Sequence, residues 1–363
     1  MAARRLAILG SRGIPARYGG FETFAQEIAT RLVDSGMDVT VFCENGGPPK
    51  YENVQLTYVP AKRLGPLTTV VFDLRCLWRA RKGFDIVYML GYGSSLFCFL
   101  PRLWGSSVWI NMDGIEWRRS KWTLPARTWL KVMEWFATKT ASRLIVDADA
   151  IGEHLRSRYV RLPKISMIPY GAAEPKRLPD DTFVRQLGLK AKSYNLIVCR
   201  LEPENHVLEI VQGYSASSTD TPLVVVGGLP LENSYVRHLM KYEASTIRFV
   251  GSVYETEQIW SLRYNCRIYF HGHSVGGTNP SLLEAMAAGN LVLAHDNIFN
   301  REVLGRNGYY FEDAQHLAKL VQHLMSLDDD IVREKMNEVR DRVRMRYSWD
   351  SVRDAYLKLI SES

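Results

Sequence analysis

Short runs of consecutive apolar residues alternate along the chain with longer segments in which apolar residues recur every three or four positions. The runs are typical of strands buried on both faces of a parallel sheet, and the longer segments are typical of helices that cover such a sheet. The first half opens with an expected strand over 6–11, a helix over 21–35 and a strand over 37–44. This alternation predicts an α/β protein with a parallel, doubly wound sheet.

The same alternation starts again in the second half, so we expect two domains. The chain has 363 residues, which is too many for one core of ordinary size. Residues 170–181 are rich in glycine, proline and aspartate, as is typical of a linker. We therefore expect a first domain over 1–172 and a second domain from 173, whose sheet begins with a strand over 194–199.

The stretch Ile268–Asn290 combines a short apolar strand, a glycine-containing turn and the start of a helix. Asn279 suits the N-cap, and Pro280 suits the first helical position. Unpaired N–H groups and the dipole at a helix N-terminus attract anions, while Glu284, one turn further, suits a sugar hydroxyl. The stretch predicts a nucleotide-sugar pocket or an ordinary capped helix after a loop, and its residues alone leave both interpretations open.

Two polar residues leave the carboxyl ends of expected strands, where ligands bind in open α/β sheets. Asp113 follows the strand over 108–112, and we expect it to contact a substrate, whereas Glu116 is expected to be structural. Arg200 follows the strand over 194–199, and its guanidinium could clamp a diphosphate with two hydrogen bonds. The alternative is that Arg200 only pairs with its neighbours Glu202 and Glu204.

The segment 117–131 holds three tryptophans and five basic residues without one acid. It lies in a strongly basic half: residues 1–170 contain 24 Lys and Arg against 14 Asp and Glu, a net charge of +10, and the remainder has −3. Indoles and cations suit the surface of an anionic membrane, and the same mixture could stack on single-stranded nucleic acid. We expect Trp129, Met133 and Phe136 to form the core face of a helix. The residues expected to stay exposed are Arg118, Arg119, Lys121 and Trp122.

Composition argues against several other classes. The five cysteines are scattered, with no CxxC and no Cys/His ligand spacing, so we expect a reducing compartment and no structural metal. The apolar segment near the start is too short for a signal peptide, and no stretch is long and uncharged enough to span a bilayer. A Rossmann oxidoreductase would need a compact GxGxxG loop, which the first βαβ unit lacks. We expect a cytoplasmic protein.

Three segments, in this order, resemble the retaining GT-B glycosyltransferases of family four. The loop with Gly19 and Gly20 is similar to the donor-phosphate loop of that family, and 199–205 is similar to its segment with the diphosphate-binding arginine, here Arg200. Residues 279–286 are similar to the end of its paired-glutamate motif, with Glu284 as the glutamate expected on the ribose. The resemblance implies two facing Rossmann-like domains, the second over 173–345, and a C-terminal helix over 346–363 that crosses back to the first.

Three positions depart from the family pattern. The first glutamate of the pair is Gly276, the phosphate-binding lysine is Asn205, and the histidine of the catalytic region is Asp113. Together with the segments RYGGFET, DGIEWRRSKW, RLEPEN and HSVGGTNPSLLEAM, these changes resemble the bacterial rhamnosyltransferase branch, which uses dTDP-rhamnose on lipid-linked acceptors. The alternatives are a UDP-sugar transferase of the same fold, a GT-B epimerase, or a non-catalytic RNA-binding protein.

The resemblance implies a site and its partners. Arg200 is expected to stabilise the leaving diphosphate, and Asp113 to orient or deprotonate the acceptor hydroxyl. Glu202 or Glu204 would hold the sugar, with Glu202 counted as catalytic and the choice between them open. No metal is expected, and the partners are a nucleotide sugar, a lipid-linked saccharide and the inner face of the cytoplasmic membrane, without nucleic acid. The expected donor-binding residues are Gly19, Gly20, Arg200, Glu204, Asn205, His273, Gly276, Gly277, Thr278, Asn279, Ser281 and Glu284. The expected membrane or acceptor residues are Trp117, Arg118, Arg119, Lys121 and Trp122.

Overall fold

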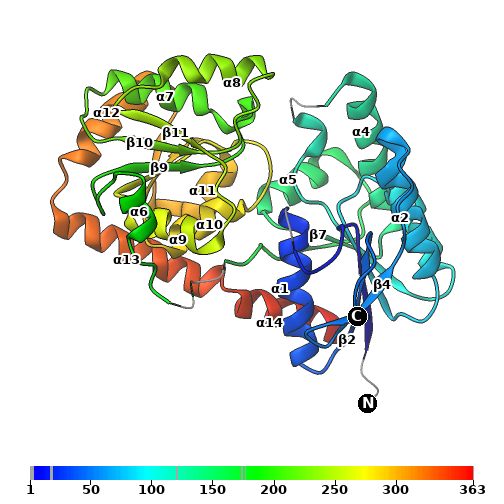
Figure 1. Cartoon of the computed structure of the whole chain (residues 1–363). Helices are drawn as coiled ribbons and strands as arrows, with labels where there is room; N and C mark the ends of the chain where they lie inside the picture. Colours follow the sequence, from blue (N-terminus) through cyan, green and yellow to red (C-terminus); the bar gives the residue numbers. More distant parts are fainter. Residues whose placement is uncertain (1–3, 17–18, 120–121, 173–174, 176, 363) are drawn as a thin grey trace. The chain divides into compact units, whose positions relative to one another are not determined.

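The computed structural model describes residues 4–16, 19–119, 122–172, 175 and 177–362. The chain forms two compact units, Met1–Gly171 with Trp349–Ser363, and Ala172–Ser348 (Figure 1). Each unit is built on its own sheet, and almost all strand pairs in both sheets are parallel. The α/β fold expected from the alternating pattern is therefore confirmed.

The first unit contains an eight-stranded sheet in the order β3-β4-β2-β1-β5-β6-β7-β8. Only the short edge strand β3 runs antiparallel to its neighbour. The central strands β1 and β5 consist almost entirely of buried residues, because helices cover both faces of a parallel sheet. The strands are β1 Arg5–Leu9, β2 Asp38–Cys43, β3 Lys50–Tyr51, β4 Val54–Tyr58, β5 Ile86–Leu90, β6 Ser107–Asn111, β7 Arg143–Val146 and β8 Lys164–Met167.

Six α-helices and three short 3₁₀ turns accompany this sheet in the described part of the unit. The α-helices are α1 Gly20–Asp34, α2 Thr68–Arg79, α3 Phe99–Arg102, α4 Leu124–Thr140, α5 Asp149–Arg158 and α14 Trp349–Ser361. The 3₁₀ turns are η1 Gly65–Leu67, η2 Ser95–Cys98 and η3 Glu116–Arg118.

The last helix, α14, belongs to the first unit. The Tyr356 hydroxyl lies 2.7 Å from the Tyr88 hydroxyl of β5, and the Phe24 ring of α1 packs against the rings of Tyr356 and Trp349. Gly171 approaches the Trp349 indole so closely that a Cβ atom would lie 2.4 Å from Cδ2 of that ring. A glycine is therefore required where the chain leaves this unit.

The second unit contains a six-stranded parallel sheet in the order β11-β10-β9-β12-β13-β14. Its strands are β9 Asn195–Val198, β10 Leu223–Val226, β11 Ile247–Gly251, β12 Ile268–His271, β13 Leu291–His295 and β14 Tyr309–Phe311. Its α-helices are α6 Thr182–Gln186, α7 Val207–Ala216, α8 Ser234–Leu239, α9 Thr256–Asn265, α10 Pro280–Ala287, α11 Ile298–Leu304, α12 Ala314–Met325 and α13 Asp329–Arg346. The 3₁₀ turns are η4 Pro203–Asn205, η5 Met240–Tyr242 and η6 Gly305–Asn307.

The strand order of the second sheet indicates where this unit can bind a ligand. The strands β9 and β12 are neighbours although about 70 residues separate them, and the chain reverses direction of travel across the sheet at this point. Such a switch leaves a crevice beyond the carboxyl ends of the two strands, which is where α/β sheets bind ligands. The segments that follow β9 and β12 are two of the three that resemble glycosyltransferase motifs.

Candidate functional site

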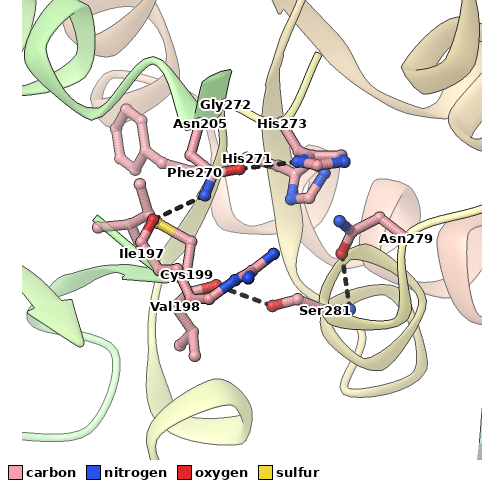
Figure 2. A pocket seen from close by; sticks show the side chains of 11 residues that line it. Ile197, Val198, Cys199, Asn205, Phe270, His271, Gly272, His273, Asn279 and Ser281 are labelled. Carbon is pink, nitrogen blue, oxygen red and sulfur yellow. Dashed lines mark hydrogen bonds between the residues drawn. The ribbon is translucent and has the colours of Figure 1, made fainter. Parts of the chain in front are cut away.

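A cavity of about 180 Å³ opens beyond the carboxyl ends of β9 and β12 in the second unit (Figure 2). The two strands contribute its floor, and the segments that follow them and the start of α10 contribute its walls. Five residues predicted for the donor site or its diphosphate clamp come together here. The predicted residues that line it are Arg200, Asn205, His273, Asn279 and Ser281.

Arg200 supplies the positive charge of the cavity. Its side chain is half exposed, and its Nη1 lies 3.5 Å from Oε1 of Glu202. Pairing with a neighbouring glutamate therefore occurs, but the contact is long and leaves most of the guanidinium open to a ligand. Neither Glu202 nor Glu204 lines the cavity, and Glu204 is buried. Their role in holding the sugar stays a prediction.

Asn205 joins the two segments that flank the cavity. Its Nδ2 donates to the Arg200 carbonyl at 2.6 Å, and its Oδ1 lies 2.7 Å from Nδ1 of His273 (Figure 2). The Asn205 backbone also approaches Gly272, where a Cβ atom would meet the Asn205 carbonyl oxygen at 1.9 Å. Asn205 is buried and occupies the position at which the resembling family has a lysine. Its side chain joins the two segments of the site by hydrogen bonds.

The start of α10 follows the predicted capping pattern, but it differs from the expected anion site in one respect. Asn279 is the N-cap, its side chain accepts from the backbone N–H of Ser281 at 2.9 Å, and Pro280 is the first helical residue. The next two N–H groups, of Leu282 and Leu283, both bond the Asn279 carbonyl. The expectation of unpaired N–H groups was therefore wrong: the cap uses them, and the helix dipole remains as the attraction for an anion.

The Ser281 hydroxyl is occupied within the protein. It donates to the Val198 carbonyl at 2.9 Å and lies 2.6 Å from the Tyr269 hydroxyl. Ser281 thus anchors α10 to the end of β9 and to Tyr269 of β12, and this anchoring fixes the helix N-terminus beside Arg200.

Glu284 is held by a buried arginine that sequence reasoning missed. The Arg263 Nη2 lies 2.6 Å from Oε2 of Glu284 and 3.3 Å from the Ser281 hydroxyl. The Arg263 side chain is only 5% exposed, whereas that of Glu284 is 34% exposed. Ser281 and Glu284 therefore share a face of α10, as expected, and one carboxylate oxygen is fixed by Arg263. Nothing around Arg263 in the sequence signals this role.

His271 is a second residue that sequence reasoning missed. It ends β12, it lines the cavity, and its side chain is buried (Figure 2). Its Nε2 has no hydrogen-bond partner among the described residues. Burial, with smaller contributions from His273 and His295, holds the pKa of His271 well below its usual value, so the ring is neutral near pH 7. A histidine that ends an otherwise apolar strand was the available signal.

The remaining predicted donor residues lie elsewhere. Gly276, Gly277 and Thr278 belong to the loop between β12 and α10 without lining the cavity. Gly276 has a φ of 123°, a backbone conformation that favours glycine. Gly19 and Gly20 lie at the N-terminus of α1 in the first unit. The donor role of these residues stays a prediction.

The first unit has a larger cavity of about 540 Å³, and Asp113 lies in its wall. Asp113 follows β6 as expected, in a left-handed conformation with φ 47°, and its backbone N–H donates to Oδ1 of Asn111 at 2.7 Å. Asp73, at the same cavity, is buried and accepts from the Ser94 hydroxyl at 2.7 Å. Burial raises the pKa of Asp73 to about 7.

The basic, tryptophan-rich segment is less exposed than predicted. Arg119 is mostly buried and pairs with Glu116 at 3.0 Å, and the Trp122 indole donates to the same carboxylate at 3.0 Å. The Trp117 indole donates to Glu134 at 2.8 Å, so it too is held against the protein. Arg118 is exposed as predicted, and Lys121 lies outside the described residues.

The expected core face of α4 was wrong in one position. Met133 is buried and Phe136 is partly buried, but Trp129 is 39% exposed because its indole donates to the Gly93 carbonyl at the surface.

Among the described residues, no helix is both long enough and apolar enough to cross a membrane. In the same part of the chain, no cluster of three His, Cys, Asp or Glu side chains could hold a metal ion.

Comparison with known proteins gives a separate family match for each half of the chain. Residues 3–173 match a family described as a domain of unknown function (DUF1972), and residues 180–342 match glycosyl transferases group 1. The match to a glycosyltransferase from Rickettsia africae covers 100% of this chain and 99% of that one, at 15% identity and a TM-score of 0.79.

Two further structures are similar over nearly the whole chain. Sucrose-phosphate synthase from Thermosynechococcus elongatus has 18% identity and a TM-score of 0.78, and HepE from Anabaena, in complex with UDP, has 17% identity and a TM-score of 0.78. Both matches cover 99% of this chain and 100% of the other. Residues 180–342, which contain the Arg200 cavity, therefore form a glycosyl transferases group 1 domain, and the chain is a glycosyltransferase with the GT-B fold.

Proposed function

We propose that the protein transfers rhamnose from dTDP-rhamnose to a lipid-linked saccharide, with retention of the anomeric configuration, at the inner face of the cytoplasmic membrane. The observation that carries the proposal is the Arg200 cavity within the glycosyl transferases group 1 domain. The choice of rhamnose and of a lipid-linked acceptor rests on the resemblance of the segments around Asp113, Arg200 and Glu284 to rhamnosyltransferases.

In this proposal, the donor diphosphate lies beside Arg200 and the N-terminus of α10. The bond between C1 of the sugar and the diphosphate oxygen breaks, its electron pair stays on that oxygen, and Arg200 and the helix dipole stabilise the new charge. The acceptor hydroxyl forms the new bond to C1 from the same face. Because a guanidinium and a helix dipole carry the charge, the proposal requires no metal.

The first unit contributes the acceptor side of the proposal. Its cavity of about 540 Å³ is large enough for a sugar ring, and Asp113 in its wall is assigned to orient the acceptor hydroxyl and to take its proton. The carboxylates and aromatic rings that line this cavity supply hydrogen-bond acceptors and apolar faces, which together suit a saccharide. Glu284, fixed by Arg263, is assigned to a ribose hydroxyl.

A UDP-sugar donor is the second candidate. HepE from Anabaena, which shares the fold, has been crystallised with UDP-glucose. The two candidates differ in the base and the sugar, and both require the diphosphate contact of Arg200.

A thermal-shift panel with dTDP-rhamnose, UDP-glucose and GDP-mannose tests the proposal. A ligand at 100 times its Kd stabilises the folded state by about 2.7 kcal/mol, so dTDP-rhamnose should raise the melting temperature clearly. A shift with UDP-glucose alone would favour the second candidate, and no shift with any nucleotide sugar would overturn the proposal. NMR of the product's anomeric proton then distinguishes retention from inversion.

A further inference from the structure

The first unit carries a surface patch that the sequence had not indicated. We call it the aromatic–basic patch, and it is formed by the end of α2, by α3 and by the residues that follow each of these helices. Its members are Trp78, Arg81, Lys82, Phe99, Arg102, Leu103 and Trp104. Its tryptophans, Trp78 and Trp104, lie outside the segment 117–131, to which the membrane interpretation had been assigned.

Large apolar side chains of the patch face solvent. Trp78 is 51% exposed, Leu103 is 67% exposed, and Trp104 is 44% exposed. Phe99 lies one helical turn before Leu103, so the two share a face of the helix. Single exposed apolar residues are ordinary, but several on adjoining elements mark an interaction site.

Cations lie directly over the exposed indoles. The Arg81 guanidinium lies 4.1 Å from the centroid of the Trp78 ring and 5.7 Å from that of Trp104, and the Lys82 ammonium lies 5.7 Å from that of Trp104. These contacts hold the residues together as one surface. Arg102 adds a further exposed cation, and its Nη1 donates to the Lys139 and Thr140 carbonyls at the end of α4.

The helices around the patch expose no acid. Asp73 is the only carboxylate of α2, Glu134 is the only one of α4, and α3 has none. Both carboxylates are buried, so the solvent-facing sides of these three fully described helices carry no negative charge. Asp85, an exposed acid that follows Lys82 in the chain, accepts from the Arg5 backbone N–H at 2.7 Å.

We infer that the aromatic–basic patch docks the protein on an anionic bilayer. Indoles settle at the level of lipid headgroups, Leu and Phe enter the acyl boundary, and Arg and Lys attract anionic headgroups. The inference rests on the proposed function in one respect, because a lipid-linked acceptor presents its sugar at such a surface. It moves the docking surface from Arg119 and Trp122, which are bound to Glu116, to α2 and α3.

Two other occupants fit the patch less well. A second copy of the chain would bring like charges together, because the patch holds cations and no exposed carboxylate. Single-stranded RNA would match the cations and indoles, but it offers nothing to Leu103, the most exposed apolar residue of the patch. An anionic membrane satisfies all three kinds of side chain.

Sedimentation with vesicles tests the inference. The full chain should pellet with phosphatidylglycerol vesicles, bind phosphatidylcholine vesicles at least tenfold more weakly, and be released from phosphatidylglycerol as salt rises. The double variant Arg81→Glu, Lys82→Glu should bind anionic vesicles at least tenfold more weakly than wild type. Trp78→Ser with Trp104→Ser should also weaken binding while leaving its salt dependence in place. The control Arg306→Glu, Lys319→Glu makes the same charge change at exposed positions of the second unit and should bind as wild type.

The outcomes separate this inference from the proposed function. Each patch variant should keep the wild-type melting temperature and the wild-type thermal shift with nucleotide sugar, since Arg200 is untouched. Vesicle binding without any nucleotide-sugar shift would overturn the proposed function alone. Absent vesicle binding, a patch variant that binds as wild type, or tighter binding to single-stranded RNA than to vesicles would each overturn the docking inference.

Discussion

The Arg263 guanidinium lies 2.6 Å from the Glu284 carboxylate, and the arginine is almost completely buried while the glutamate reaches solvent. The pair joins α9 to α10, and the same guanidinium lies 3.3 Å from the Ser281 hydroxyl. A buried cation sets the position of a partly exposed carboxylate, which is the arrangement required of a side chain that must meet a ligand hydroxyl in a fixed geometry.

We predict that Arg263→Met lowers the free energy of unfolding by about 3 kcal/mol, because Glu284 and Ser281 both lose a buried partner. Urea unfolding measures the change. Arg267→Met is the matched control: Arg267 is more exposed and lies 3.8 Å from Asp329, so the loss there should stay below about 1 kcal/mol. Equal losses in the two variants would mean that Arg263 contributes no more to stability than Arg267 does with its long contact to Asp329.

The elements around this pair could be predicted from the sequence, but the pair itself could not. The strand before the glycine-containing turn, the Asn279 cap and the helix after it follow from local patterns of apolar and capping residues. The partner of Glu284 lies 21 positions earlier on a different helix, and only the packing of α9 against α10 brings the two together. Buried pairs of this kind are properties of tertiary structure.

Two further outcomes differ in whether the sequence could have predicted them. Asn205 could be identified as a replacement for a lysine, but its cross-link to His273 depends on the neighbouring strands β9 and β12. The segment 117–131 was predicted to be an exposed basic surface because it contains no acid of its own. Glu116 lies just before the segment and pairs with Arg119, and this i, i+3 ion pair could have been predicted from the sequence.

Arg200→Ala is expected to reduce kcat/KM for sugar transfer about thirtyfold. This factor corresponds to a loss of transition-state stabilisation on the order of 2 kcal/mol, because a charge-assisted contact to the diphosphate is lost. Arg185→Ala is the control. Arg185 is also an exposed arginine of the second unit, paired with Asp181 at 3.0 Å, and it does not line the cavity. Wild-type turnover in Arg200→Ala would remove Arg200 from the site.

Asp113→Asn should abolish transfer while the melting temperature and nucleotide-sugar binding stay close to wild type. The φ of 47° at this position is tolerated by Asn as well as Asp, so the backbone stays unstrained and only the base is removed. Asp113→Ala is expected to be less stable than Asp113→Asn for that reason. Transfer that survives in Asp113→Asn would show that the carboxylate does not act on the acceptor.

His271→Leu is expected to weaken nucleotide-sugar binding without lowering the free energy of unfolding. Replacing a buried histidine whose Nε2 lacks a partner by an apolar side chain should leave the free energy of unfolding unchanged or raise it. If the imidazole bonds the donor, the same change should weaken nucleotide-sugar binding about tenfold, or about 1.4 kcal/mol. Isothermal titration measures the affinity, and His271→Asn, which keeps a donor group, should recover part of it. Unchanged affinity in His271→Leu would exclude a contact with the donor.

Asp73 is expected to make stability depend on pH. Its pKa is raised by burial to about 7 in the folded protein from an ordinary value of 3.8. Between these values the folded state binds more protons than the unfolded state, so the contribution of Asp73 is complete below pH 3.8 and is lost as the pH rises to about 7. Above pH 7 the buried carboxyl must ionise, with the Ser94 hydroxyl as its donor.

Asp73→Asn removes this ionisation while preserving the shape of the side chain. At pH 8 the variant should therefore be more stable than wild type by on the order of 2 kcal/mol, and at pH 5, where Asp73 is protonated, the difference should be smaller. Thermal unfolding from pH 5 to 8 measures both curves, with Asp85→Asn as a control at an exposed carboxylate of the same unit. A constant difference between wild type and Asp73→Asn across this range would contradict the assignment, because a purely steric effect of the substitution does not change with pH.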